Sequence, residues 1–383
     1  MPVFAVALLL SLLLKLLKPA ALPRDLLYRV LFLAFAIPAV YLAVFIIRHP
    51  GQNLSEPFSL VKGLWAILLI LPVAAAEADL KKPALVLVGI MAASIIGLRF
   101  LAVSDPALYE KISLFLVDHH VARIGSRHFG EVDVMMIYFA TTPLVIIVVP
   151  FLMHLIFGKP GRVWPKFGAL LFLGLILAAS LFSAARALLV VLLMECLACY
   201  LFIHRRRLQL VAGSLALAGI FLVLGLMVVQ RTELLSADEQ SNSIKIAHFE
   251  SFLAFINDNP AVLLTGDGLG ATYFSHAPEV NQEVYQTELT YLDTVRYFGL
   301  AGALFFLALL FMPLLLPGSN GLWTIGLLSY LIVAGNNPLL FNSTGMLALV
   351  FFWSQQVRSS QNSSQAVKPA SRALTGTPAG AVI

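Results

Sequence analysis

Charged side chains are scarce in this sequence. Only 12% of the 383 residues are Asp, Glu, Lys or Arg, whereas 60% are hydrophobic. A soluble domain of this length needs many more polar side chains to cover its surface. The alternation of apolar and polar residues that is typical of an outer-membrane barrel is also lacking. The composition therefore predicts an integral membrane protein built from helices, because helices satisfy their own backbone hydrogen bonds in lipid.

Motifs of nucleotide, metal and nucleic-acid sites are missing as well. The "GDGLG" segment at 266–270 follows no expected strand and lacks the Lys and Ser/Thr of a phosphate-binding loop. Cys196 and Cys199 form a CxxC pair, but no second pair completes a metal site, so we interpret them as packing thiols. Basic residues do not alternate with aromatic ones as in a nucleic-acid-binding patch. We therefore expect no metal, no cofactor and no nucleic-acid partner.

Long apolar runs are abundant, and most approach the ~20 residues that a helix needs to cross the hydrocarbon core. We predict an all-α fold, a polytopic integral membrane helical bundle with about 11 spans (roughly 10–12). The expected spans are residues 3–17, 26–47, 60–76, 84–103, 134–157, 167–183, 187–203, 209–229, 297–316, 322–335 and 344–357.

Basic residues concentrate in alternate loops, which the positive-inside rule assigns to the cytoplasm. These loops are "KLLKPAALPR", "DLKKP", "GKPGRVWPK", "HRRRLQ" and the tail after Arg358. The predicted organisation is an N-terminal bundle at 1–229 with an outer loop at 104–132, a large partly helical outer loop at 230–296, C-terminal spans at 297–357 and a disordered cytoplasmic tail at 358–383. The short hairpin that holds Arg186 then also lies outside.

The large outer loop contains a predicted amphipathic helix in the segment "IKIAHFESFLAFI". Its apolar positions recur every three or four residues and are Ile246, Phe249, Leu253 and Ile256. The "NDNP" sequence that follows ends the helix. Such a helix would lie against the membrane surface or pack on the transmembrane bundle. After it, Gly268 and Gly270 allow tight turns or a close approach of the backbone to a ligand.

Arg186 stands between two of the most apolar stretches of the chain, in "FSAARALLVVLL". The predicted topology places it at the outer membrane boundary, where a span begins and its free N-terminal amides point outward. A guanidinium beside a helix N-terminus is a good receptor for phosphate oxygens. The alternative is an arginine that extends to the interface at a helix end without binding a ligand.

Further cations lie in the two outer loops. Arg231, Lys245 and His248 are the only basic or imidazole groups in the first half of the large loop. They either pair with neighbouring acids or converge on one anion such as a pyrophosphate. Arg123 and Arg127, in the other outer loop, are candidates to assist at such a site.

Glu288 lies in "YQTELTYLD", just before the chain re-enters the membrane. A carboxylate in a partly dry interfacial pocket becomes more basic, because desolvation disfavours its charge. That property suits a general base for a sugar hydroxyl. The alternative is an ordinary loop acid, since Glu279, Glu283 and Asp293 lie nearby. Glu195 stands in mid-span, where a charge is costly, and we expect it to face the bundle interior.

In this order, the segments resemble the bacterial O-antigen polymerase and O-antigen ligase superfamily. The family's serine-arginine signature is present as "FSAAR", with Ser183 and Arg186. Its late loop is present as "IKIAHFESFLAFINDNPAVLLTGDGLGATYF" followed by "ELTYLDTVRYFGLAG". The resemblance covers residues 167–316 and depends on the order and spacing of these motifs. It implies a glycosyltransferase of the bacterial inner membrane that acts at the periplasmic face on undecaprenyl-pyrophosphate-linked oligosaccharide, with a chain-length regulator and a flippase as partners.

Two departures from the family pattern refine this expectation. Ligases carry His-Asn three residues before the motif tyrosine, whereas Glu288 and Leu289 stand here, which favours a polymerase. Lys245 occupies the position of the loop arginine, so it keeps the charge but loses the bidentate fork, and Arg231 is its candidate substitute.

The site expected from the resemblance has three catalytic residues, Arg186, Lys245 and Glu288. Its substrate-binding residues are Arg231, His248, Arg123, Arg127, Gly268 and Gly270. The alternatives are an O-antigen ligase, a transporter or flippase for lipid-linked sugars, and a structural subunit of an export complex. Apart from Glu195, charges gather at the outer boundary and not at the bilayer midplane, which favours chemistry over transport.

Overall fold

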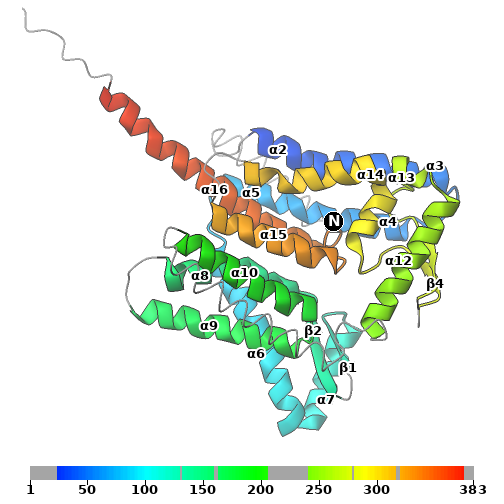
Figure 1. Cartoon of the computed structure of the whole chain (residues 1–383), viewed down its shortest axis with the longest axis horizontal. Helices are drawn as coiled ribbons and strands as arrows, with labels where there is room; N and C mark the ends of the chain where they lie inside the picture. Colours follow the sequence, from blue (N-terminus) through cyan, green and yellow to red (C-terminus); the bar gives the residue numbers. More distant parts are fainter. Residues whose placement is uncertain are drawn as a thin grey trace, which may run out of the picture.

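The computed structural model describes residues 24–129, 132–158, 163–205, 240–277, 280–315 and 320–374. It is mostly helical, at 77%. Most helices run along one common direction, and a group of shorter elements gathers at one end (Figure 1). The predicted spans 3–17 and 209–229 lie outside the described residues, as does Arg231.

Within the described residues, six helices are long and apolar enough to cross a membrane. They are Asp25–Arg48 (from α2, Arg24–Leu31, through η1, Phe32–Ala36, to α3, Ile37–Arg48), Ser55–Ala75 (α4, Ser55–Leu64; η2, Trp65–Leu69; α5, Ile70–Ala75), α6 (Lys81–Ser104), α9 (Val163–Phe182), α10 (Arg186–His204) and α14 (Thr290–Phe311). Two shorter apolar helices are Thr142–Phe157 (η3, Thr142–Val148; α8, Val149–Phe157) and α15 (Gly321–Gly335). The prediction of a helical membrane protein is confirmed in this form, and the count of about 11 spans stays a prediction.

The predicted span at 134–157 is wrong in its first part. Residues Val132–Phe139 form strand β2, which pairs antiparallel with β1, Ala122–Phe129. The β2 sequence "VDVMMIYF" is rich in β-branched and aromatic side chains, which favour strands when a partner strand is available. The hairpin follows helix α7, Pro106–Asp118, and both elements lie at the same end of the molecule (Figure 1).

Helix α16 runs from Ser343 to Leu374 and so extends beyond the last predicted span into the segment expected as a tail, whose disorder stays a prediction. No glycine, the residue that most often ends helices, occurs between Met346 and Leu374. Residues 348–357 of this helix are buried all round, and they pack among α4, η2, α5 and α15. Trp353 donates its indole N–H to the carbonyl of Leu310 at 3.3 Å, which satisfies its polar atom in this core.

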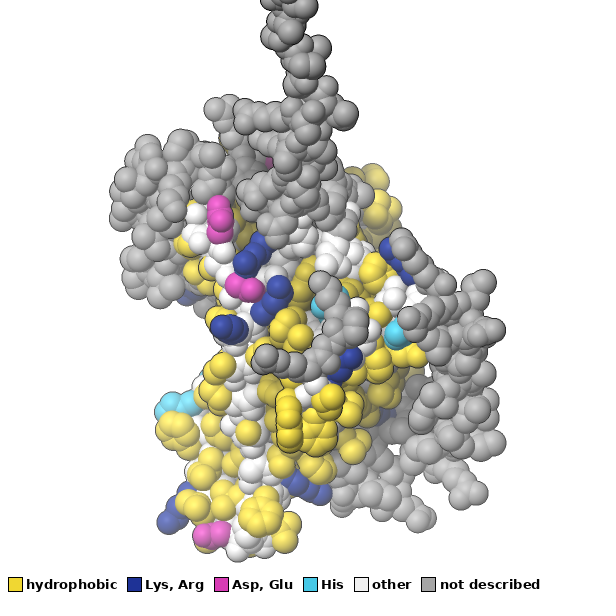
Figure 2. All heavy atoms as spheres, turned by 90° about the vertical axis from the view of Figure 1, so that its left-hand side faces the viewer, with side chains coloured by type: hydrophobic (Ala, Val, Ile, Leu, Met, Phe, Trp, Pro, Cys, Tyr) yellow, Lys and Arg dark blue, Asp and Glu magenta, His cyan; other side chains and the backbone are white. Residues whose placement is uncertain are grey.

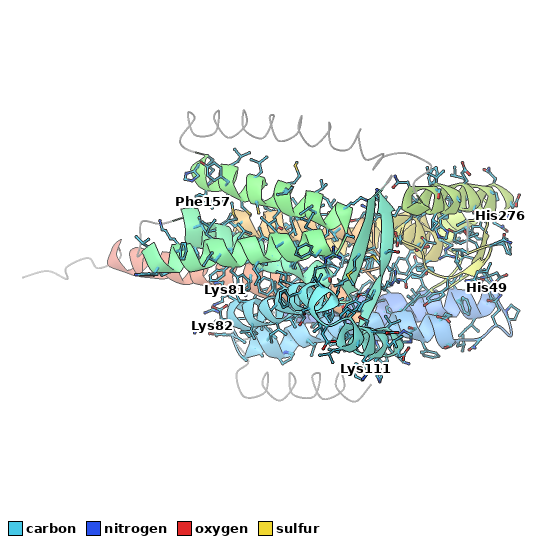
Figure 3. The ribbon with its side chains drawn as sticks, turned by 90° about the horizontal axis from the view of Figure 1, so that it is seen from below. His49, Lys81, Lys82, Lys111, Phe157 and His276 are labelled. Atoms are coloured by element: carbon cyan, nitrogen blue, oxygen red, sulfur yellow. The ribbon has the colours of Figure 1, made fainter. Side chains whose placement is uncertain are left out.

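A contact at one end of the bundle joins two segments that were predicted to lie on the same side of the membrane. At one end, the Arg358 guanidinium lies 3.2 Å from the carboxylate of Asp79, and these residues belong to two segments expected on the same side. Figure 2 shows Lys and Arg side chains beside acidic ones on this end of the molecule. Figure 3 shows Lys81 and Lys82 towards this end, and His49 and His276 at the opposite end. Which end faces the cytoplasm stays a prediction.

The large loop folds into a small unit at the opposite end. Helix α12 (Gln240–Asp258) lies across the end of the bundle and is followed by α13 (Val262–Thr265), β3 (Tyr273–Ser275) and β4 (Gln282–Val284), with β3 and β4 paired antiparallel (Figure 1). Its small core consists of Phe252, Ile256, Val262, Tyr273 and Val284.

The predicted helix in this loop is confirmed, but its predicted apolar face is only partly used. Ile256 is buried, whereas Ile246, Phe249 and Leu253 are each 44% exposed. The buried face instead includes His248, Ser251 and Phe252. Two polar side chains, His248 and Ser251, therefore lie on the buried face of α12 where apolar side chains were expected. His248 is part of the candidate site.

Candidate functional site

Three of the predicted site residues meet where α12 passes the segment before α14. The Lys245 ammonium lies 3.3 Å from the Glu288 carboxylate, and the two side chains are 25% and 37% exposed. His248 follows Lys245 by one helical turn and is buried. The negative charges of Asp293 and Glu288 both act on its imidazole. The ion pair is partly exposed to solvent, whereas His248 on the same helix is buried.

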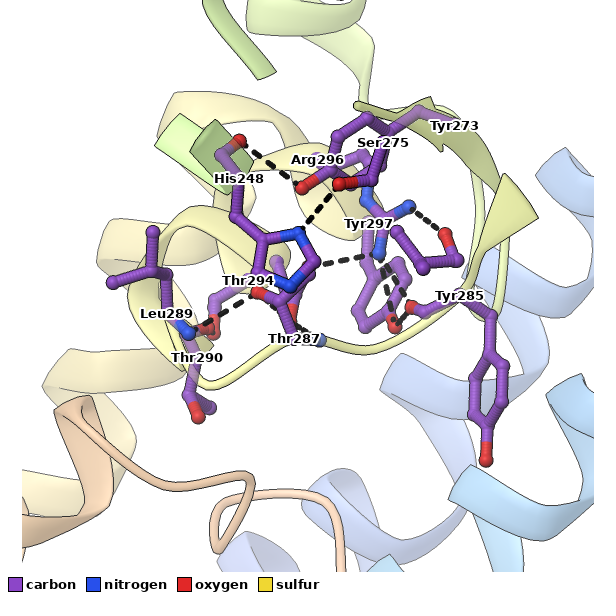
Figure 4. Close-up of polar contacts among 12 residues, drawn as sticks. His248, Tyr273, Ser275, Tyr285, Thr287, Leu289, Thr290, Thr294, Arg296 and Tyr297 are labelled. Carbon is purple, nitrogen blue, oxygen red and sulfur yellow. Dashed lines mark hydrogen bonds and ion pairs between the residues drawn. The ribbon is translucent and has the colours of Figure 1, made fainter. Parts of the chain in front are cut away.

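His248 is held by polar groups of strand β3. Its Nδ1 lies 2.7 Å from the hydroxyl of Ser275, and its carbonyl accepts a hydrogen bond from the Tyr273 hydroxyl at 3.2 Å (Figure 4). Burial lowers the pKa of His248, against the charges of Asp293 and Glu288, which raise it. Burial also raises the pKa of Tyr273 to about 12. At neutral pH the imidazole is therefore uncharged and the phenol keeps its proton.

A buried ion pair, Asp293 with Arg296, lies behind this group. The Arg296 Nη2 is 2.8 Å from Asp293 Oδ1, and its Nη1 donates to the carbonyl of Val284 at 3.0 Å. Its Nη2 also donates to the carbonyl of Tyr285. The guanidinium is stacked on Tyr273, with 4.7 Å to the ring centroid. Arg296 is fully buried, and its contacts with the carbonyls of Val284 and Tyr285 hold this part of the loop against α14.

The other oxygen of Asp293 binds the residue before Glu288. Asp293 Oδ2 accepts hydrogen bonds from the backbone N–H of Thr287 at 2.6 Å and from its hydroxyl at 3.0 Å. The Thr287 hydroxyl oxygen in turn accepts from the backbone N–H of Leu289 at 3.1 Å (Figure 4). The backbone on both sides of Glu288 is therefore fixed, while its side chain extends towards Lys245.

Sequence reasoning missed Arg296 and treated Asp293 as one loop acid among several. The signal was present in "YLDTVRYFGLAG", where an acid and a base three residues apart begin an otherwise apolar span. Charges at such a position are stable when they pair on one helix face. The pair could thus have been inferred, although its carbonyl partners could not.

The two loop glycines have a packing role in the structure. Gly268 has a φ of +96°, and a Cβ there would collide with the backbone nitrogen of Phe45. Gly270 has a φ of +83°, and a Cβ there would lie 2.8 Å from the nitrogen of Pro57. The close backbone approach that these glycines allow is thus to α3 and α4. Their contact with a substrate stays a prediction.

Arg186 begins α10 and is half-buried. The neighbouring Ser183 is buried and donates its hydroxyl to the carbonyl of Ser180 at 2.7 Å. The Arg99 guanidinium lies 5.9 Å from the ring centroid of Phe182, so a second cation approaches the same hairpin. Helix α9, which leads into this hairpin, contacts β2 at the end of the bundle where α12 also lies (Figure 1).

The other predicted cations are more dispersed. Arg123 is exposed on β1, opposite Tyr138 of β2. Arg127 belongs to the same strand, but its side chain is outside the described part of the structure. Glu195 is buried in the bundle as expected, and neither of its carboxylate oxygens has a hydrogen-bond partner among the described residues.

The arrangement at Lys245 and Glu288 combines an anion-binding group with a proton acceptor. Across the described ranges, no group of three or more His, Cys, Asp or Glu side chains could hold a metal ion. Lys245 offers an ammonium to an anionic ligand, and Glu288 offers a carboxylate oxygen to a hydroxyl. No protein-family model matches the chain, and no curated protein matches it.

Proposed function

We propose that this protein is a membrane glycosyltransferase that polymerises undecaprenyl-pyrophosphate-linked oligosaccharide repeat units at the periplasmic face of the bacterial inner membrane. The observation that carries the proposal is the half-exposed Lys245–Glu288 pair, 3.3 Å apart at one end of a bundle of apolar helices. The order of the "FSAAR", "GDGLG" and "ELTYLDTVRYFGLAG" motifs supports the same reaction. The substrate class and the active face are part of the proposal.

The reaction assigns a different task to each member of the pair. The anomeric C–O bond between the growing chain and its lipid pyrophosphate breaks, and a new C–O bond forms to a hydroxyl of the next repeat unit. The bonding electrons leave with the pyrophosphate, whose charge Lys245 neutralises. Glu288 takes the proton of the attacking hydroxyl.

Substrate binding changes the partner of Lys245. In the free protein the ammonium and the carboxylate neutralise each other across 3.3 Å. A pyrophosphate carries more negative charge than one carboxylate, so it attracts Lys245 away from Glu288. The Glu288 carboxylate is then free to accept a hydrogen bond from the acceptor hydroxyl. Arg186, at the start of α10, is the second cation in this proposal.

The proposal is tested with purified protein in lipid vesicles and a synthetic polyprenyl-pyrophosphate-linked repeat unit. Glu288→Gln keeps the shape of the side chain but removes the base, and we expect about a hundredfold slower polymerisation. Lys245→Met is expected to weaken catalysis to a similar degree. The matched control is Glu250→Gln, the same chemical change at an exposed position of α12. Equal rates for Glu288→Gln and Glu250→Gln would contradict the assignment.

A cellular assay separates the polymerase from the ligase. In a gel of surface polysaccharide, loss of a polymerase leaves a single repeat unit attached to the acceptor. Loss of a ligase leaves the polymer on its carrier lipid. We expect Glu288→Gln cells to show the first pattern, and the second pattern would assign the chain to ligation.

A further inference from the structure

The segment that carries Glu288 is fixed to α14 at two points, both N-terminal to Glu288. At Thr287, the residue directly before Glu288, Asp293 Oδ2 accepts hydrogen bonds from the backbone N–H at 2.6 Å and from the hydroxyl at 3.0 Å. Further upstream, Arg296 donates to the carbonyls of Val284 and Tyr285. Because Asp293 and Arg296 also bind each other at 2.8 Å, the two attachments form one connected unit.

The position of Glu288 therefore depends on groups that it does not touch. Asp293 and Arg296 are one helical turn apart on α14, so their separation is set by the helix. The Thr287 hydroxyl binds Asp293 and receives the N–H of Leu289, which closes the backbone around Glu288. Asp293 and Arg296 are buried beneath the surface that carries Glu288 and Lys245.

We propose that Asp293, Arg296 and Thr287 are positioning residues, which hold the Glu288 carboxylate against Lys245. The effect of these residues on the position of Glu288 can be tested without any assay of activity, whereas their effect on catalysis rests on the proposed function. A general base displaced by about 1 Å loses much of its effect on the rate. The alternative is a purely structural ion pair, whose loss would leave Glu288 and Lys245 at the same separation in the folded protein.

A zero-length crosslink distinguishes these two roles in the full chain. A water-soluble carbodiimide activates a carboxylate, and a lysine in contact with it displaces the activating group and forms an amide. The Lys245–Glu288 crosslink is quantified by peptide mass spectrometry. The Lys81–Asp79 pair, 3.8 Å apart at the opposite end of the bundle, is the internal reference for folding and reagent access.

Three variants test the attachment at different points. Thr287→Val keeps the volume but removes both hydroxyl contacts, and we expect about a fivefold lower crosslink yield relative to the reference. Asp293→Asn places an amide N–H against either Thr287 or Arg296, which are donors, and a similar loss is expected. Thr287→Ser keeps the hydroxyl and should restore the yield. Unchanged normalised yields in both Thr287→Val and Asp293→Asn would overturn the proposal.

Kinetics of the same variants connect the geometry to the reaction. We expect Thr287→Val to lower kcat about tenfold with little change in KM, because binding by Lys245 remains while the base is misplaced. Thr287→Ser should recover kcat. If the unmodified protein shows no polymerase activity, the proposed function fails while the crosslink still decides the positioning role. If crosslinking falls as expected but kcat does not, Glu288 is not the base and positioning has no catalytic consequence.

Discussion

Arg296 offers a quantitative test of the buried ion pair. Replacement by Met keeps most of the side-chain volume but removes the guanidinium, which binds Asp293 at 2.8 Å and the carbonyl of Val284 at 3.0 Å. Breaking a buried pair leaves an uncompensated charge and costs about 3–5 kcal/mol. Loss of the hydrogen bond to the carbonyl of Val284 adds about 1 kcal/mol, whereas the carbonyl of Tyr285 still accepts from the Tyr297 hydroxyl. We expect Arg296→Met to lower the free energy of unfolding by about 4–6 kcal/mol.

The double variant Asp293→Leu/Arg296→Met separates charge from packing. Without either charge, no buried ion is left unpaired, and the double variant should be about 2–3 kcal/mol more stable than the sum of the two single changes predicts. Unfolding of the purified protein in mixed detergent micelles, followed by tryptophan fluorescence, measures each free energy.

The control for this series is Arg358→Met, which breaks the pair with Asp79. These side chains are 40% and 42% exposed, so the expected loss is below about 1 kcal/mol. The reasoning is refuted if Arg296→Met and Arg358→Met cost the same, or if the effects at Asp293 and Arg296 simply add.

Two further predictions concern the loop. Gly268→Ala should lower the free energy of unfolding by about 2–3 kcal/mol, because a φ of +96° is strained for alanine and the added Cβ would collide with the backbone of Phe45. The control is Gly97→Ala in α6, where the added Cβ meets no atom within 4 Å and should not lower the free energy of unfolding. Burial lowers the pKa of His248 in the folded protein below its usual 6.5. The buried neutral imidazole therefore contributes its full stability to the fold above pH 6.5, and this contribution is lost as the pH falls through the lower pKa of the folded state. Between about pH 7.5 and pH 5 the unmodified protein should therefore lose more stability than His248→Gln, measured by unfolding midpoints, and parallel pH curves would contradict this.

Local patterns in the sequence predicted the elements that carry the candidate site. Lys245 and His248 are three residues apart on a helix that the apolar periodicity indicated, so their common direction followed from helix geometry. The approach of Glu288 to this helix depends on the fold of the whole loop. It was expected only through the order of the motifs.

Non-local contacts set the features that the sequence did not predict. The partners of Arg296 are carbonyl oxygens, and every residue type has one, so no pattern identifies Val284 as its acceptor. The segment at 132–139 is apolar enough to be predicted as the start of a membrane span. It forms a strand because it pairs with β1, which its own sequence does not indicate. Gly268 signalled an unusual backbone, but its neighbour Phe45 is far away in the sequence.

The position of α16 has a consequence for biosynthesis. Residues 348–357 fill the centre of the bundle among α4, η2 and α5, which leave the ribosome much earlier. Until α16 is inserted, the faces of those earlier helices that contact it lack this packing partner. Packing of this part of the interior therefore waits for α16, and a chain stalled or truncated before this helix would leave the apolar side chains of α4, η2 and α5 without their partner.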